Sequence, residues 1–205
     1  MAKSASEGKG RGPGRGKTIA VMGVTAVAIL AVSYIANKPA SGGSFTSVVL
    51  TGATSSGPAP EIGKPAPDFT AMTLEGEKVT LSQLRGHPVW LTVGASWCQP
   101  CRAESPDIEA AWEKYRHTGL KLVAVFIQDN RADIESFAQR AGLTYPKIDD
   151  SDSAIASSYR IVGIPSHFFI DRSGVLREIK ITSLDPETMA ESLAEIGVHG
   201  ARSSR

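Results

Sequence analysis

Cysteine is scarce in this chain: only Cys98 and Cys101 occur among its 205 residues. A structural zinc site needs four ligands, usually two cysteine pairs or one pair with suitably spaced histidines. The sequence has no third cysteine, and no ligand spacing is found among its histidines, His87, His117, His167 and His199. Zinc binding is therefore a weak interpretation of the pair. A purely structural disulfide is also a weak one, because closing so short a ring removes little chain entropy and stabilises little.

The chain also lacks internal repeats and an excess of charge of one sign. Its 22 basic and 21 acidic residues give a formal net charge of +1, so nothing in the composition indicates a nucleic-acid partner. The charge is unevenly placed, because residues 1–17 contain five basic residues against one acidic residue. With glycine at every second position from 8 to 16, this basic tail is expected to be disordered.

Residues 18–37 contain no charged side chain. A helix that crosses a bilayer needs about 20 apolar residues, and the basic flank on the N-terminal side predicts that residues 1–17 are cytoplasmic. We therefore expect a single-pass signal anchor in the cell membrane, with the rest of the chain outside the cytoplasm. A cleaved signal peptide is the alternative, although its apolar core would usually be only about 7–15 residues long.

The remaining chain divides by composition into a linker, a globular part and a tail. Residues 38–60 are rich in Ser, Thr, Gly, Ala and Pro, which is typical of a flexible tether. Residues 61–200 contain the apolar patterns of a folded domain, and residues 201–205 are expected to fray.

The two cysteines are separated by two residues, follow an apolar run over residues 88–93 and precede a helix-like stretch. A C-x-x-C sequence between a strand and a helix is typical of a thiol–disulfide redox site. Cys98 would lie where the helix N–H groups are unpaired and the helix dipole is positive, which favours the nucleophilic thiolate. Cys101, one turn further on, would be placed to attack a mixed disulfide and release the product.

Periodicity and turn residues predict an α/β fold for residues 61–200. Strands are expected over residues 89–95, 120–127, 146–149, 166–171 and 175–181, and helices over residues 80–86, 99–116, 131–141, 152–159 and from 185 onward. The order of βαβαβα followed by ββα predicts a mixed central sheet with helices on both faces.

This organisation resembles the thioredoxin fold. More narrowly, residues 61–196 resemble the TlpA/ResA-like family of membrane-anchored thioredoxins, through motifs that occur in the same order at residues 63–69, 81–86, 95–106 and 159–174. The cysteine motif by itself indicates the broad fold, and residues 101–106 indicate this branch of it. The resemblance implies a thiol–disulfide oxidoreductase that uses no cofactor and no metal.

The resemblance also implies roles for residues around the redox-active disulfide. Cys98 would be the attacking thiol and Cys101 the resolving thiol, while Pro100, between them, would influence the redox potential. Trp97 would shield the site, and an ordinary packed aromatic residue is the alternative. Glu104, one helical turn after Cys101, would accept the proton of Cys101 during resolution, and a solvated surface glutamate is the alternative.

Pro165, preceded by Ile164, matches the family's cis-proline beside the cysteines. It would keep a backbone edge open for substrate and would exclude a metal-binding side chain from the sulfurs. An ordinary trans proline in a turn is the alternative.

Three positions depart from the family pattern. Thr92 stands where many thioredoxins have a buried aspartate, which shifts the role of base toward Glu104 or water. Gly94 replaces an aromatic residue and either leaves space for a partner or is compensated by repacking. His167 would tune the site by its charge, but a partly exposed structural histidine is the favoured interpretation.

The sequence therefore predicts a membrane-tethered thiol–disulfide oxidoreductase that reduces disulfide-containing protein substrates, for example apocytochrome c before haem attachment. A reductant also needs an electron donor, here expected to be a membrane thiol transporter. A disulfide oxidase or isomerase on the same fold is the nearest alternative. A peroxiredoxin, and a copper-binding module using Cys98, Cys101 and His167, are the others.

Overall fold

The structure, a computed structural model, describes residues 59–199 and the backbone of residues 48–49. The expected basic tail, the apolar segment 18–37, the frayed C-terminus and most of the expected linker lie outside the described residues. Within the described part of the chain, no helix has the length and hydropathy needed to cross a membrane.

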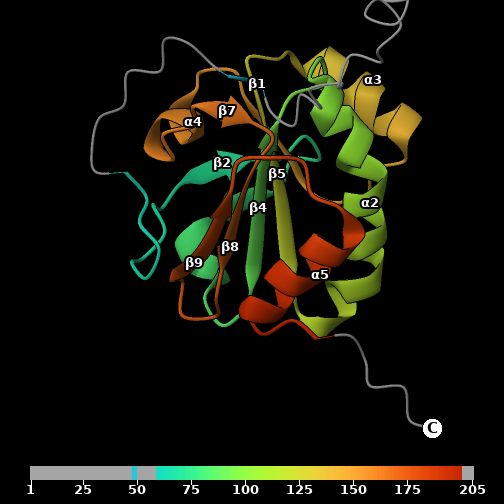
Figure 1. The fold of residues 1–205 in the computed structure, drawn as a ribbon. Coiled ribbons are helices and arrows are strands. Elements are labelled where there is room, and N and C mark those ends of the chain that lie inside the picture. The colour runs from blue at the N-terminus through green and yellow to red at the C-terminus, as the bar shows by residue number, and fades with distance from the viewer. Residues whose placement is uncertain (1–47, 50–58, 200–205) are drawn as a thin grey trace, which may run out of the picture. The chain divides into compact units, whose positions relative to one another are not determined.

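The centre of the domain is a mixed five-stranded sheet with the order β6-β5-β4-β8-β9 (Figure 1). β4, β5 and β6 run parallel, β8 is antiparallel to β4, and β9 is antiparallel to β8. The predicted mixed sheet and its closing hairpin are therefore confirmed. The strands are Lys147–Asp150 (β6), Lys121–Ile127 (β5), Val89–Gly94 (β4), Ser166–Ile170 (β8) and Leu176–Lys180 (β9).

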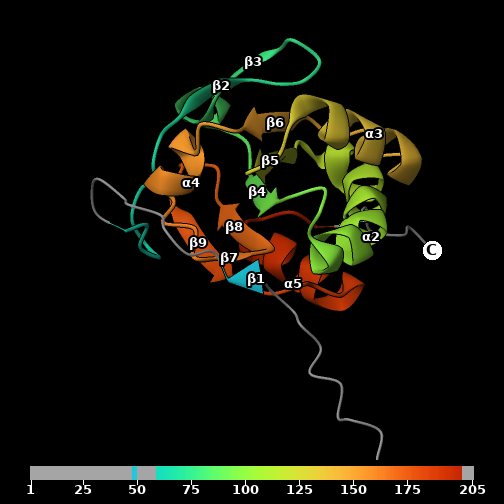
Figure 2. The same ribbon diagram turned by 90° about the horizontal axis from the view of Figure 1, so that it is seen from above.

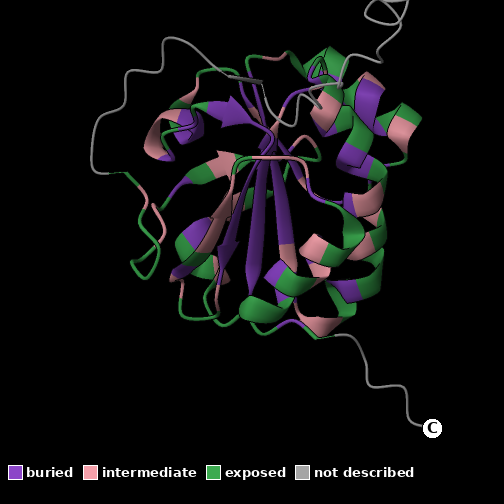
Figure 3. Ribbon diagram, viewed as in Figure 1, coloured by how far each residue is buried: buried purple, intermediate pink, exposed green. Residues whose placement is uncertain are grey.

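Helices cover both faces of this sheet, as predicted (Figures 1 and 2). One face packs against α2 (Gln99–Tyr115), α3 (Arg131–Ala141) and α5 (Pro186–Glu195), and the other against α4 (Ala154–Ser158) and the 3-10 helix η1 (Leu81–Leu84). Side chains alternate between the two cores along β4, and the central strands are buried almost throughout (Figure 3). The smaller elements are β1 (Val48–Val49), β2 (Thr70–Met72), β3 (Lys78–Thr80), η2 (Arg116–Thr118) and β7 (Gly163–Ile164).

Helix boundaries mostly follow the expected local signals. Gly142 ends α3 in the left-handed conformation, and Asp185 caps α5 by accepting from the Thr188 N–H at 2.7 Å. The expectation that Asp152 caps α4 is confirmed only in part. Ser153 is the N-cap residue, and the carboxylate of Asp152 accepts from the Ala154 N–H at 3.2 Å. The N–H groups of Ile155 and Ala156 are bound by the carboxylate of Asp150, at the end of β6.

The register between β4 and β8 positions the site. Val93 pairs with Ser166 and Thr92 pairs with His167, so the start of β8 lies beside the end of β4. The cysteine motif follows β4 directly, and the Ile164–Pro165 peptide bond precedes β8 directly. Two segments about 70 residues apart in the sequence are thereby brought together by ordinary antiparallel pairing.

In the β8–β9 hairpin, the ionised carboxylate of Asp171 is expected to contribute to the stability of the fold. Burial on its own would raise the pKa of this carboxyl, but hydrogen bonds from Ser173, Val175 and Arg177 outweigh it and lower the pKa from 3.8 to about 2. Because the folded-state pKa is depressed, the stabilisation is complete above about pH 4 and is lost as the pH falls toward 2. We expect Asp171→Asn to destabilise the protein by about 1–2 kcal/mol at pH 7 and by far less near pH 2.5.

Urea unfolding across this pH range measures the effect, with the exposed Glu61→Gln as the control position. A destabilisation by Asp171→Asn that is the same at every pH would contradict the assignment.

Candidate active site

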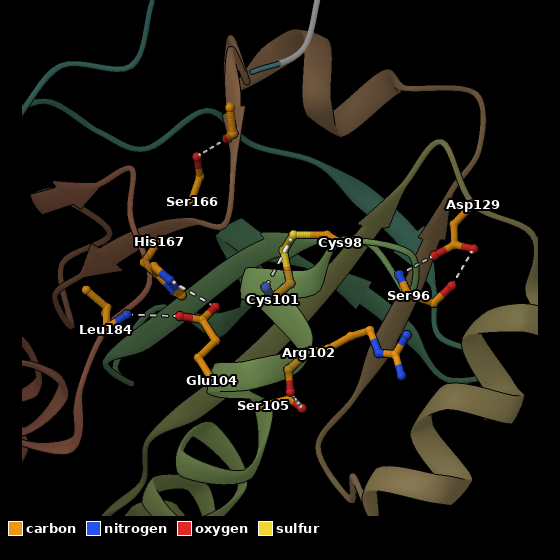
Figure 4. The surroundings of a disulfide bond; sticks show 11 residues. Ser96, Cys98, Cys101, Arg102, Glu104, Ser105, Asp129, Ser166, His167 and Leu184 are labelled. Carbon is orange, nitrogen blue, oxygen red and sulfur yellow. Dashed lines mark hydrogen bonds and ion pairs between the residues drawn. A yellow bond between two sulfur atoms is a disulfide. The ribbon is translucent and has the colours of Figure 1, made fainter. Parts of the chain in front are cut away.

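Cys98 and Cys101 form a disulfide at the start of α2 (Figure 4). Cys98 is the N-cap residue of the helix, and its Sγ accepts a hydrogen bond from the Cys101 N–H at 3.3 Å. Gln99 and Pro100 occupy the first turn, where a proline needs no N–H partner. The sulfur of Cys98 therefore lies at the positive end of the helix dipole, which stabilises a thiolate when the disulfide is reduced.

The exposure of the two cysteines is the reverse of what their expected roles would require. Cys98, the predicted attacking residue, is 0% exposed, and Cys101 is 8% exposed. An incoming substrate can therefore reach Cys98 only after neighbouring groups move.

Trp97 is 45% exposed, and its indole N–H donates to the Gln128 carbonyl at 3.0 Å. The alternative of an ordinary packed aromatic residue is wrong. The ring lies at the surface directly before Cys98, and its one polar group is fixed by the loop between β5 and α3.

The same loop supplies a contact that the sequence analysis missed. The carboxylate of Asp129 accepts from the Ser96 N–H at 2.6 Å and from the Ser96 hydroxyl at 3.0 Å (Figure 4). Gln128, just before it, has a φ of 49°, in the left-handed region. These groups fix the backbone directly before the cysteines. A usable signal was Asp129 at the carboxyl end of a buried parallel strand, because neighbouring loops meet at this edge of a sheet.

Gly94 lets Cys101 approach the backbone at the end of β4. A Cβ atom added at Gly94 would lie 3.3 Å from the Cys101 Sγ and 3.4 Å from its Cβ. The space created by the missing side chain is therefore filled by Cys101. Repacking, the second of the two interpretations of Gly94, is the one that the structure supports.

We expect Gly94→Ala to raise the reduction potential by on the order of 30 mV, since crowding a packed site by one methyl group destabilises it by about 1–3 kcal/mol. In the oxidised protein the Cys101 sulfur is bonded and cannot turn away from the new methyl group, whereas in the reduced protein its side chain can rotate. Equilibration with dithiothreitol measures the potential, and urea unfolding of each redox form locates the effect. Equal destabilisation of both forms would contradict this explanation.

Glu104 is buried in α2, with only 4% of its surface exposed, so the alternative of a solvated surface glutamate is wrong. One carboxylate oxygen accepts from the Leu184 N–H at 3.0 Å, and the other lies 3.4 Å from the His167 Nε2 (Figure 4). Glu104 and Cys101 line a common cavity of about 30 Å³, together with Thr92 and Tyr145. Burial raises the pKa of Tyr145, and the charges of Glu109 and Glu104 raise it further, so this hydroxyl stays neutral.

His167 is fully buried, at 0% exposed, so the favoured interpretation of a partly exposed histidine is wrong. Its Nδ1 accepts from the Trp90 indole N–H at 3.3 Å, and its Nε2 faces Glu104. Neither ring nitrogen is directed at the sulfurs, which gives no support to a copper site built from His167 and the cysteines. No group of three or more metal-ligating His, Cys, Asp or Glu side chains is found among residues 59–199.

The Ile164–Pro165 peptide bond is cis, as expected from the resemblance. Ile164 is fully buried in the same core cluster as both cysteines. The backbone edge just before Pro165 is not open, however. Gly163 and Ile164 form β7, which pairs antiparallel with β1 through Val49 and Val48 (Figure 2). The expectation of a vacant substrate edge is therefore wrong for this state of the molecule.

Comparison with known proteins agrees with this geometry. The sequence profile of the AhpC/TSA family matches residues 62–179. The thiol-disulfide oxidoreductase ResA of Geobacillus thermodenitrificans is 31% identical over 135 residues, which cover 66% of this chain and 78% of that one. The crystal structure of StoA from Bacillus subtilis is 28% identical with a TM-score of 0.56, covering 63% of this chain and 98% of that one. A thiol:disulfide interchange protein from Chlorobium tepidum shares the fold, with a TM-score of 0.61 at 23% identity over 67% of this chain and 99% of that one.

Proposed function

The chain belongs to the AhpC/TSA family of thioredoxin-like proteins and is a thiol–disulfide oxidoreductase of the ResA type, and from this premise we propose that it is a membrane-anchored, extracytoplasmic reductant of protein disulfides. The observation that carries the chemistry is the position of Cys98 as the N-cap of α2, with Cys101 one turn behind it. The anchor and the location are supported by the charge-free residues 18–37 and their basic flank.

The proposed reaction transfers two electrons from the protein dithiol to a substrate disulfide. The Cys98 thiolate attacks one substrate sulfur, the first substrate thiolate leaves, and a mixed disulfide forms on Cys98. Cys101 then loses its proton and attacks the Cys98 sulfur, which releases the second substrate thiolate and closes the protein disulfide. The two thiolates that leave take up the two protons released by the protein thiols.

Glu104 is the group that we propose to accept the proton of Cys101. It is the carboxylate that shares the small cavity with Cys101, and Thr92, which also lines the cavity, cannot act as a base. The cavity is large enough for one water molecule, so the proton can pass directly or through such a water.

The proposed substrates are the haem-binding cysteines of apocytochrome c, and the proposed electron donor is a membrane thiol transporter. The resemblance to the TlpA/ResA-like family supports the reducing direction. A peptide that contains an oxidised C-x-x-C-H sequence tests it, because this sequence is the attachment site of c-type haem. The reduced protein is expected to reduce the peptide disulfide nearly stoichiometrically, as followed by mass spectrometry after alkylation.

Net oxidation of the reduced peptide by the oxidised protein would instead support a disulfide oxidase. Rapid consumption of hydrogen peroxide with little peptide reduction would support a peroxidase.

The proposed topology has its own test. The full chain, expressed in a bacterial host, is expected to stay in carbonate-washed membranes with its initiator end intact. A C-terminal tag is expected to be digested by protease added to spheroplasts. Release of a shortened soluble protein would show that residues 18–37 are a cleaved signal peptide.

A further inference from the structure

The buried His167 lies between two groups that fix its proton. The Trp90 indole N–H can only donate, and it lies 3.3 Å from the His167 Nδ1. Nδ1 must therefore accept, so the single proton of the neutral ring is on Nε2. A second proton would place two N–H donors against each other in a site where both rings are fully buried. The contacts of His167 therefore direct the Nε2 proton toward Glu104, and tuning of the site by a positive histidine is not the role that this geometry favours.

The protonated Nε2 faces the carboxylate of Glu104 at 3.4 Å. Within the described part of the chain it forms no aligned hydrogen bond, so the contact is loose in the disulfide state. Such contacts are often long in resting enzymes and shorten during reaction. The other carboxylate oxygen is bound by the Leu184 N–H. Glu104 therefore faces two donors, one at each carboxylate oxygen, which together fix the orientation of the carboxylate.

From these contacts we propose that His167 is a positioning residue that keeps the Glu104 carboxylate oriented beside Cys101 for the resolving step. This inference rests on the proposed role of Glu104 as proton acceptor. In the step, the S–H proton of Cys101 moves to a Glu104 oxygen, the freed electron pair forms the bond to the Cys98 sulfur, and the substrate thiolate leaves.

The surroundings of Glu104 single out His167 for this role. Tyr145, facing the same cavity, is kept neutral by burial and provides no charge. Cys101 supplies the proton, and Leu184 contributes a backbone donor that side-chain substitution does not remove. Without the imidazole, one carboxylate oxygen would lose the donor that it faces, and Glu104 would be held only by the Leu184 N–H. Its oxygens would then be less well placed to accept the proton of Cys101.

The test uses the reduced full-length protein with 5,5′-dithiobis(2-nitrobenzoate), whose coloured thiolate is released twice. The first release reports attack by Cys98, and the second reports resolution by Cys101. For His167→Leu we expect an unchanged first phase and a second phase slowed about ten-fold at pH 7, recovering toward the wild-type rate by pH 9. His167→Gln, which keeps a donor and an acceptor, is expected to restore most of the rate.

Two further variants make the result decisive. Glu104→Gln combined with His167→Leu is expected to be no slower than Glu104→Gln alone, because the histidine acts through the glutamate. Trp90→Phe combined with His167→Leu removes the unpaired indole donor and tests whether a loss of folding explains the effect. Equal slowing of both phases, or a slowed second phase that does not depend on pH, would overturn the proposal. The assay reports resolution whichever direction the protein works in vivo, so it can fail independently of the proposed function.

A second and independent observation concerns the occupied edge beside Pro165. Gly163 and Ile164 pair with the chain's own β1, the Gly163 carbonyl is fixed by the Ser166 hydroxyl at 2.6 Å, and Cys98 is fully buried. An extended polypeptide added to a sheet edge binds mainly through its backbone, so one strand excludes another. A segment tethered by few residues has an effective concentration in the millimolar range.

We infer that the segment containing Val48–Val49 competes with substrate for the β7 edge and so limits access to Cys98. This inference also rests on the proposed function. Replacing both residues by proline in the full chain removes the backbone N–H groups that pairing requires. We expect a several-fold lower KM for the oxidised C-x-x-C-H peptide with little change in kcat, and faster alkylation of reduced Cys98 by iodoacetamide.

The control places two prolines at Ser55 and Ser56, in the same part of the chain but outside β1. Unchanged KM and alkylation in the Val48–Val49 variant, or the same changes in the control, would overturn the inference. Alkylation needs no substrate, so it distinguishes failure of this inference from a wrong choice of peptide.

Discussion

Replacing Cys101 by serine is expected to stop turnover and to trap the substrate on Cys98 as a stable mixed disulfide. The first step needs only the Cys98 thiolate at the start of α2, and this position is unchanged in the variant. The second step needs a thiol one turn further on, which serine cannot supply. Mass spectrometry of the variant after reaction with the oxidised peptide is expected to show one covalent peptide per chain and no released dithiol.

Cys98→Ser is the matched control and is expected to form no adduct. The comparison matters here because Cys101 is the more exposed of the two sulfurs, at 8% against 0%. An adduct on Cys101 in the Cys98→Ser variant, with none on Cys98 in the Cys101→Ser variant, would show that the roles are reversed.

Glu104→Gln is expected to slow the resolving step on the order of 100-fold at neutral pH, while attack by Cys98 is nearly unchanged. The amide can still accept from the Leu184 N–H, so the fold should tolerate the change, but it cannot accept the proton of Cys101. Stopped-flow measurement of both phases between pH 5 and 9 tests this prediction. Glu113→Gln, at an exposed position on the same helix, is the control.

If Glu104→Gln left the pH dependence of thiol reactivity unchanged, the proton-acceptor role would be wrong. The buried carboxylate would then be a structural cap for the Leu184 N–H and a partner of His167 only.

The fold was largely predictable because its signals are local. The apolar run before the cysteines has the length of a buried strand and is one. Gly142 and Asp185 mark helix ends because each satisfies the backbone groups of the adjacent helix turn. The position of Cys98 was predictable for the same reason. When a C-x-x-C sequence lies between a strand and a helix, its first cysteine falls at the start of the helix.

The rest of the site depends on contacts between distant segments. Glu104 could face solvent or the core from its place in the helix, and its burial is decided by His167 and the Leu184 loop. The Asp129–Ser96 contact joins positions 33 residues apart, and the local sequence indicates only that both residues follow buried parallel strands at the same edge of the sheet. The first turn of α4 is bound by Asp150 as well as by Asp152, because the end of β6 presents the Asp150 carboxylate to the N–H groups of Ile155 and Ala156.

The reduction potential of the Cys98–Cys101 couple in the full chain, equilibrated against dithiothreitol or glutathione, tests the central claim most directly. A reductant of protein disulfides is expected to have a value near or below that of thioredoxin, about −270 mV. A value near −120 mV, typical of a strong disulfide donor, would contradict the proposed direction and would identify the protein as an oxidase on the same fold.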